Sequence, residues 1–209
     1  IERSLKNLKT DCLDLVYLHH CNFGKDGEYF NEALNVLTNF KNQGRLRFIG
    51  LSDWSNSRIM KYIKMCDPDV VQPYRNVMDD GFIKSGLCSY VNKNNLGVCF
   101  FSPIKHGLLT GKYDRPTSFE IGDHRSGVKD FADQNVIDKM KQNKLLLEKR
   151  FTKHKYPVMR GLVDALFNDA KSGCVLLGQR NVDQVNVAST LGEPLDEKDS
   201  VWVKSLYQH

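Results

Sequence analysis

The chain has 209 residues, of which 41% are hydrophobic and 26% are charged, so we expect a globular domain with one sizeable core. No segment approaches the ~18 unbroken apolar residues of a membrane span. The net charge of +5 comes from Lys and Arg residues spread along the chain, which argues against nucleic-acid binding and leaves room for one anionic ligand.

Cysteine usage points to a reducing environment. The six cysteines show neither a CxxC pair nor the spacing of a zinc site, and we expect no metal. Cys66, Cys99 and Cys174 lie in apolar patterns, in which cysteine behaves as a small hydrophobic residue. No secretory signal is visible, so we expect a cytoplasmic protein with reduced thiols.

The pattern of residues 1–9 is typical of the end of a helix, so we expect the chain to start inside an element and to lack upstream sequence, with a natural mature terminus as the alternative. Short apolar strands then alternate with amphipathic helices. The strands are predicted over Leu13–His19, Arg47–Asp53, Val70–Tyr74, Val98–Ile104 and Cys174–Gly178. Nearly continuous apolar runs of this kind are typical of parallel strands that are covered on both faces.

Three helices are readable from apolar residues spaced at i, i+3, i+4 and i+7. The first has the apolar positions Ala33, Val36, Leu37 and Phe40, and it ends near Gly44. The second begins at the N-cap Ser55 and has the apolar positions Ile59, Tyr62, Ile63 and Cys66. The third opens with Pro157 and has the apolar positions Met159, Leu162, Val163, Leu166 and Phe167.

This order implies parallel strands joined by right-handed crossovers. The first four strands start 23 to 34 residues apart, but a much longer interval precedes the fifth. That interval holds a polar insertion over residues 114–132, where a barrel carries a cofactor-covering loop. Five strands could form an open doubly wound sheet or part of a barrel, and periodicity does not decide between them.

Every predicted strand ends in polar residues, which suggests a shared site at one face of the sheet. These residues are His19-His20, Ser52-Asp53, Gln72 with Asn76, Ser102 with His106, and Gln179-Arg180. Barrel enzymes place their chemistry at the carboxyl ends of strands. Taken singly, each has a plainer interpretation: a structural histidine, turn and capping chemistry at Ser52-Asp53, or a loop amide at Gln72.

The turn Gly178-Gln179-Arg180-Asn181 is a candidate phosphate site. Asn181 and Gln184 have capping-box spacing, which predicts a helix whose core face includes Val182 and Val185. Free N–H groups at a helix start favour phosphate, and Arg180 offers a planar fork of donors. The alternative is a plain capped helix with an exposed Arg. No GxGxxG element supports a Rossmann-type site.

Five segments in consistent order resemble the aldo-keto reductase family. They are Thr10–His19, Arg47–Ser55, Val70–Gln72 with Asn76, Phe101–Tyr113 and Leu176–Gln184, within a resemblance over residues 4 to about 188. The resemblance implies an α/β fold, a (β/α)8 TIM barrel that is N-terminally truncated to about five βα units. We therefore expect one partial barrel domain over residues 1–209.

The resemblance also implies roles for individual residues. His19 is the implied catalytic residue, which orients the substrate carbonyl, while Ser52, Asp53 and Gln72 hold the nicotinamide carboxamide and Phe101 stacks on the ring. The residues implied along the pyrophosphate path are Ser102, Ile104, Gly107, Leu108 and Lys112, with Arg125 on the covering loop. Those implied around the adenosine 2′-phosphate are Gly178, Arg180 and Gln184, which favours NADP(H) as the cofactor.

Three departures from the family pattern matter. Asp53 stands where the family has Asn, and an ionised carboxylate accepts hydrogen bonds without donating them. Val187 and Ala188 stand where a Glu-Asn pair contacts adenine. The catalytic Asp, Tyr and Lys of the family would lie upstream of residue 1, so we expect this chain alone to be poorly stable or to associate, and not to reduce carbonyls.

The predicted function is NAD(P)H-dependent reduction of aldehyde or ketone carbonyls by hydride transfer, with a small-molecule substrate and no nucleic-acid or membrane partner. The alternative is an NADP(H)-binding regulatory subunit on the same fold, like the potassium-channel β subunits. His19 favours the enzyme, because those subunits do not keep a histidine at this position. Neither the substrate nor the oligomeric state follows from the sequence.

Overall fold

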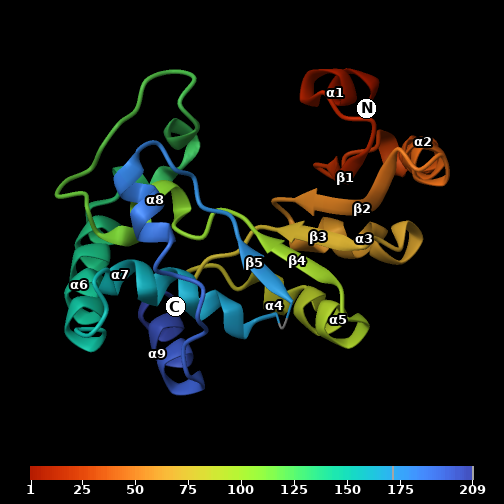
Figure 1. Ribbon diagram of the computed structural model, residues 1–209. Helices are drawn as coiled ribbons and strands as arrows, with labels where there is room; N and C mark the ends of the chain where they lie inside the picture. Colours follow the sequence, from red (N-terminus) through yellow and green to blue (C-terminus); the bar gives the residue numbers. More distant parts are fainter. Residues whose placement is uncertain (171, 209) are drawn as a thin grey trace. The chain divides into compact units, whose positions relative to one another are not determined.

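A computed structural model describes residues 1–170 and 172–208 (Figure 1). The chain forms two compact units: Ile1–Tyr74 with Gly81–Cys99, and Arg75–Asp80 with the described residues from Phe100 onward. The prediction that residues 1–209 form one partial barrel domain stays a prediction. In the described ranges, no helix combines the length and hydropathy that crossing a bilayer requires.

The first unit is a parallel sheet with helices between its strands. Its elements are α1 (Glu2–Leu8), β1 (Leu13–His19), η1 (Lys25–Gly27), α2 (Phe30–Asn42), β2 (Leu46–Asp53), α3 (Asn56–Cys66), β3 (Val70–Pro73), α4 (Gly81–Lys84), α5 (Leu87–Asn94) and the start of β4 (Gly97–Phe100). Strand β1 pairs with β2, β2 with β3, and β3 with β4, all in parallel (Figure 1). The βα order predicted from the sequence is confirmed here.

Helix α3 follows the predicted apolar spacing, whereas in α2 Leu37 is buried but Val36, predicted on the same apolar face, is 47% exposed. The side chain of Ser55 accepts a hydrogen bond from the backbone N–H of Arg58 and caps α3 as predicted. Ile59 and Ile63 are fully buried in α3, which packs on β2. Helix α2 ends at Asn42, and Gly44 follows with φ of +70°, a left-handed conformation that glycine adopts at no steric cost.

The second unit is built mostly from helices and irregular segments. Its elements are the end of β4, η2 (Lys105–Thr110), η3 (His124–Gly127), η4 (Lys129–Ala132), α6 (Gln134–Arg150), α7 (Pro157–Met159), η5 (Arg160–Asp164), η6 (Ala165–Asn168), β5 (Gly173–Val175), α8 (Val182–Ala188) and α9 (Glu197–Tyr207). Directly after β5, the backbone N–H of Leu176 donates to the carbonyl of Phe100 at 2.9 Å. The third predicted helix opens at Pro157 but continues as a π-helix in η5 and a 3-10 helix in η6.

Two predicted strands are shorter than expected. The strand predicted over Val98–Ile104 ends at Phe100, and Ser102 then has φ of +60°. Extended backbone has negative φ, so a residue in the left-handed region ends the strand. The strand predicted over Cys174–Gly178 is confined to Gly173–Val175.

Two burial predictions in the second unit are wrong. Val182 and Val185 are 73% and 49% exposed, so they do not form the core face of α8. Helix α8 has seven residues, none of them buried, and therefore its apolar side chains have no core to pack against. Cys174, predicted as a small hydrophobic residue in an apolar pattern, is exposed.

Candidate functional site

In the first unit, strand register brings three predicted site residues side by side. His19 of β1 is the ladder partner of Ser52 in β2, and Ser52 is the partner of Gln72 in β3. In-register residues of parallel strands point to the same face of a sheet. The next register row inward, Leu51 with Val71, is fully buried on the opposite face. His19, Ser52 and Gln72 therefore form a polar row at the carboxyl ends of three neighbouring strands.

The two histidines at the end of β1 differ in conformation. His19 keeps extended backbone as the last residue of the strand. His20 has φ of +66°, and its backbone N–H donates to the carbonyl of Ser52 at 2.8 Å. Their rings stack with centroids 3.9 Å apart, and both residues are exposed. Strand β1 therefore ends before His20, and His19 is the histidine that belongs to the polar row.

Asp53, which the family resemblance implies at the nicotinamide carboxamide, is the last residue of β2. It follows Ser52 in the same strand, so its side chain points to the opposite face. The carboxylate is 1% exposed; its Oδ1 accepts from the backbone N–H of Ser55 at 2.6 Å, and Oδ2 lies 3.8 Å from the Arg58 guanidinium. These contacts are those of a turn leading into α3, the plainer of the two interpretations of this residue.

In the second unit, Phe101 and Ser102 are held by a neighbouring loop, Arg75–Asp80. The backbone N–H of Arg75 donates to the carbonyl of Phe101 at 3.1 Å, and the Asn76 side-chain amide donates to the carbonyl of Ser102 at 3.4 Å. The Ser102 hydroxyl is buried and has no hydrogen-bond partner among the described residues. A buried hydroxyl without a partner is costly, and it suits a polar ligand.

The segment after Ser102 turns sharply before Lys112. Ile104 lies at the N-cap of η2, and Gly107 has φ of +90°. A Cβ at Gly107 would lie 3.1 Å from the Lys112 amino nitrogen, so this backbone and that cation are neighbours. Leu108 is fully buried directly after Gly107.

The insertion over residues 114–132 contains an ion pair that the sequence analysis missed. The Asp123 carboxylate accepts from Arg125 Nε at 3.0 Å and from Nη2 at 2.5 Å, while the guanidinium lies 4.1 Å from the centre of the Phe119 ring. Arg125 holds the pKa of Asp123 well below its usual range, and Arg180 lowers this pKa further. Burial, followed by the charges of His124 and Arg125, lowers the pKa of His106.

The turn before α8 has the predicted cap. Asn181 Oδ1 accepts from the backbone N–H of Gln184 at 3.0 Å, and Gln184 Oε1 accepts from the backbone N–H of Arg180 at 2.6 Å. Arg180 is exposed, and no carboxylate of the described residues lies within ion-pair distance of its guanidinium. A Cβ at Gly178 would meet open space. Arg180 and Arg125 both lie within the electrostatic range of Asp123.

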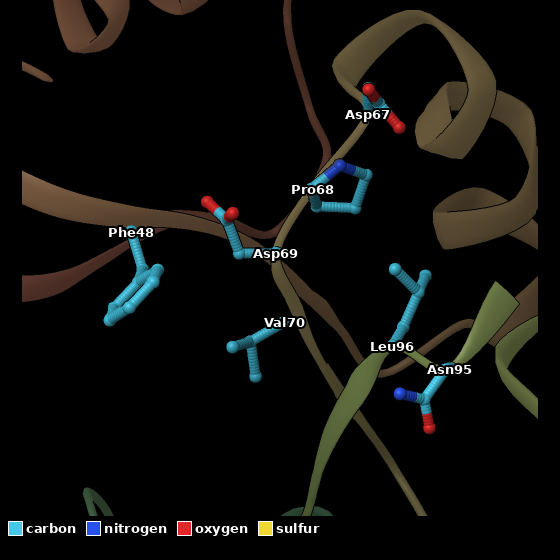
Figure 2. Close-up of a pocket in the computed structure, with 7 residues that line it drawn as sticks. All are labelled: Phe48, Asp67, Pro68, Asp69, Val70, Asn95 and Leu96. Atoms are coloured by element: carbon cyan, nitrogen blue, oxygen red, sulfur yellow. The ribbon is translucent and has the colours of Figure 1, made fainter.

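The first unit also has a hollow on the side of the sheet where β3 and β4 begin (Figure 2). Its lining residues are Phe48, Asp67, Pro68, Asp69, Val70, Asn95 and Leu96. Asp69 Oδ2 already accepts from Lys41 Nζ and from the backbone N–H of Ile49, each at 2.9 Å. None of the predicted site residues lines this hollow, which lies at the strand ends opposite those used by barrel enzymes.

Within residues 1–170 and 172–208, no group of three or more His, Cys, Asp or Glu side chains could hold a metal ion. The candidate residues form two sets, each within its own unit: the polar row of the first unit and the basic groups of the second. The ion pair between Asp123 and Arg125 could have been predicted from the sequence, because the acidic residue lies two positions before the candidate phosphate ligand.

Comparison with known proteins places the chain in a family. The profile of the Aldo/keto reductase family matches residues 1–207. The chain is 29% identical over 140 residues to an NADP(+) aldo-keto reductase of Schizosaccharomyces pombe, covering 65% of this chain and 39% of that protein. It is 26% identical over 145 residues to an NADH-specific methylglyoxal reductase of Escherichia coli, covering 68% and 44%.

The solved structure of a glycerol dehydrogenase from Gluconobacter oxydans matches with a TM-score of 0.82 at 25% identity, covering 98% of this chain and 61% of that one. This match confirms the predicted aldo-keto reductase fold in preference to an open doubly wound sheet. The chain spans about half the length of the curated relatives that it matches, 55% for the first two. The family profile, the order of the strands and the structural match agree, and the chain belongs to the aldo/keto reductase family.

Proposed function

We propose that this chain provides the NADP(H)-binding part of an enzyme that reduces aldehyde or ketone carbonyls. The observation that carries the proposal is Arg180, whose exposed guanidinium has no ion-pair partner in the described ranges. Arg180 lies two residues after Gly178 and directly before Asn181, the N-cap of α8. An Arg guanidinium binds a phosphate through paired hydrogen bonds. This arrangement supports a nucleotide with a 2′-phosphate, although relatives of both cofactor types are known.

Other residues of the second unit fit a dinucleotide. Lys112 places a cation beside Gly107, a residue without a side chain, so a phosphate can approach the backbone there. The Ser102 hydroxyl, which has no hydrogen-bond partner among the described residues, offers a buried donor. When bound, the reduced nicotinamide supplies a hydride to the carbonyl carbon. In the proposal, Phe101 covers one face of the nicotinamide ring and so selects the face from which hydride leaves.

The first unit contributes the polar row. Ser52 and Gln72 offer a hydroxyl and an amide, which together donate and accept hydrogen bonds, as a carboxamide group requires. His19, in register with Ser52, orients the substrate carbonyl oxygen. The Asp53 carboxylate is engaged by Ser55, so the proposal gives it a structural part in the turn and no contact with the cofactor.

Proton donation in this family falls to a Tyr whose pKa is lowered by a Lys, and no residue among the 209 matches either motif. The proposal is therefore that the purified chain binds NADPH and does not turn over carbonyls. Turnover at the rate of a complete reductase would contradict this half of the proposal.

The test is a titration of the purified chain with NADPH, followed by nucleotide fluorescence. We expect saturable binding that weakens by about 10- to 100-fold in Arg180→Ala, because a charge-assisted bond to phosphate contributes roughly 1.5–3 kcal/mol. Gln179→Ala, at the neighbouring exposed position, is the matched control, and NADH binding should not change in either variant. Absence of NADPH binding by a chain that is folded by circular dichroism would overturn the proposal.

A further inference from the structure

A buried arginine lies in the second unit at a place that no assigned role explains. Arg75 is 1% exposed and follows β3. Its Nε and Nη2 donate to Asp169 Oδ2, each at 2.8 Å, and Asp169 is itself 7% exposed. The other carboxylate oxygen, Oδ1, accepts from Lys204 Nζ of α9 at 2.5 Å. The buried pair Arg75–Asp169 and the half-buried Lys204 therefore form an ionic triad that joins three segments distant in sequence.

The remaining donor of Arg75 organises its own loop. Nη1 donates to the carbonyl of Asn76 at 2.7 Å and also to the carbonyl of Asp79. Asn76, which is fully buried, accepts from the backbone N–H groups of Met78 and Asp79 at 3.0 Å each. One guanidinium and one amide thus fix the path of residues 75–80.

This loop is what holds Phe101 and Ser102. The carbonyl of Phe101 accepts from the backbone N–H of Arg75, and the carbonyl of Ser102 accepts from the Asn76 side chain. Phe101 forms a single β-bridge beyond the end of β4, and Ser102 has a left-handed φ of +60°, so the strand pairing does not extend to Ser102. Its position depends on the loop, and the loop depends on the guanidinium.

The energetics favour a positioning role over a stabilising one. Burying a guanidinium and a carboxylate costs several kcal/mol of desolvation, which their attraction only partly offsets. Apolar residues of similar size often stabilise a core equally well or better. The guanidinium does what an apolar residue cannot, because it binds a carboxylate and two backbone carbonyls at fixed angles.

We propose that the Arg75–Asp169–Lys204 triad positions the Phe101–Ser102 peptide for the nicotinamide end of the cofactor and makes that position depend on the docking of α9. Arg75 is a positioning residue, since it touches neither substrate nor cofactor in this scheme. The inference rests on the proposed NADP(H) function.

The ligand test separates the two ends of the nucleotide. Arg75→Lys keeps the buried charge but cannot reach the carboxylate and both carbonyls together. We expect it to stay folded by circular dichroism, to bind NADPH about ten-fold more weakly, and to bind 2′,5′-ADP, which lacks the nicotinamide, as the native chain does. Native affinity for NADPH in Arg75→Lys, or an equal loss for both ligands, would overturn the proposal.

A second measurement does not depend on ligand. Lys204→Met leaves the Arg75–Asp169 pair in place and removes a side chain that is 17% exposed, so the variant is expected to fold. Amide hydrogen exchange at Arg75, whose N–H donates to Phe101, should accelerate at least about three-fold, while exchange at Leu176, whose N–H donates to Phe100, stays unchanged. An unchanged exchange rate at Arg75, or the same acceleration at Arg75 and Leu176, would overturn the positioning role.

The two tests also distinguish this inference from the proposed function. If the native chain binds neither NADPH nor 2′,5′-ADP, the proposed function fails, and the ligand half of the inference fails with it. If the native chain binds both and the Arg75 and Lys204 variants behave like it, the proposed function stands and only the triad's role is overturned.

Discussion

The two units hold their candidate residues by different means. In the first unit, His19, Ser52 and Gln72 lie side by side because three parallel strands are in register. In the second unit, Phe101 and Arg125 lie on segments without a continuous strand ladder. The carbonyl of Phe101 accepts from the backbone N–H of Arg75, and the Asp123 carboxylate holds Arg125. The candidate residues of the first unit therefore depend on the apolar core beneath the sheet, whereas those of the second unit depend on individual charges and amides.

This difference predicts where each unit tolerates substitution. A strand ladder is maintained by many backbone bonds and a shared core, so single polar changes at its surface matter little. A loop held by one guanidinium or one carboxylate has no such redundancy, and loss of one partner leaves the other buried and unpaired.

The largest expected contrast is in thiol reactivity. Burial raises the pKa of Cys21 and that of Cys66, both in the first unit, to about 12. At pH 8 their thiolate fraction is about 1,000-fold below that of an ordinary thiol, and access is restricted as well. We expect Cys174, exposed in the second unit, to be labelled by iodoacetamide first, with Cys21 and Cys66 labelled only after unfolding; site-resolved mass spectrometry checks this.

Early labelling of Cys21 or Cys66 in a chain with native circular dichroism would show that the first unit opens locally. That outcome would remove the contrast between a rigid sheet unit and a more loosely held second unit.

The next effect concerns the core of the first unit. Leu51 is fully buried beneath the polar row, and Leu51→Ala should lower the free energy of unfolding by about 2–5 kcal/mol, from lost burial and the cavity that remains. Urea unfolding followed by Trp54 fluorescence in a Trp202→Phe background reports on this unit. Val36→Ala on α2, at a side chain 47% exposed, is the matched control and should change it by less than about 0.5 kcal/mol.

The smallest effect concerns the charge balance of the second unit. Asp123 occupies Arg125 and lies in the field of Arg180, so its carboxylate opposes an incoming phosphate. Asp123→Asn should strengthen NADPH binding by about two- to five-fold at low salt and by less at high salt, because exposed charges are screened. Weaker binding in this variant would instead mean that Asp123 orders Arg125 for the ligand.

The sign of the pH dependence follows from the lowered pKa of Asp123. A carboxyl group whose pKa is depressed in the folded state stabilises that state at pH values above its ordinary pKa. This stabilisation is lost as the pH falls through the depressed pKa. The difference in the free energy of unfolding between the native chain and Asp123→Asn should therefore be constant between about pH 5 and pH 8. A native chain that approaches the variant only in strong acid would agree with this.

Much of the first unit followed from sequence. Strand β1 has the predicted bounds, β2 begins one residue earlier than predicted, and Ser55 caps α3 as predicted. These features depend on short-range patterns: period-two and continuous apolar runs, and a capping side chain three residues before its N–H partner. The alignment of His19 with Ser52 required only that the strands be parallel and adjacent.

The second unit followed less well, because its conformation depends on long-range contacts. Nothing local predicts that Ser102 is left-handed, since the residues that hold it, Arg75 and Asn76, lie 26 or 27 positions earlier. Asp169 meets Arg75 across 94 positions. The exposure of Val182 was also missed, because an apolar residue in a seven-residue helix is buried only if a neighbouring element covers it.

By itself, then, the sequence determined the α/β class, the order of the strands, the helix caps and the family, because these reside in local periodicity and in motifs of a few residues. Only the tertiary structure decided that Arg75 is buried against Asp169, 94 positions away. Ion pairs and buried polar contacts depend on which side chains meet in space, and spacing along the chain carries no information about that.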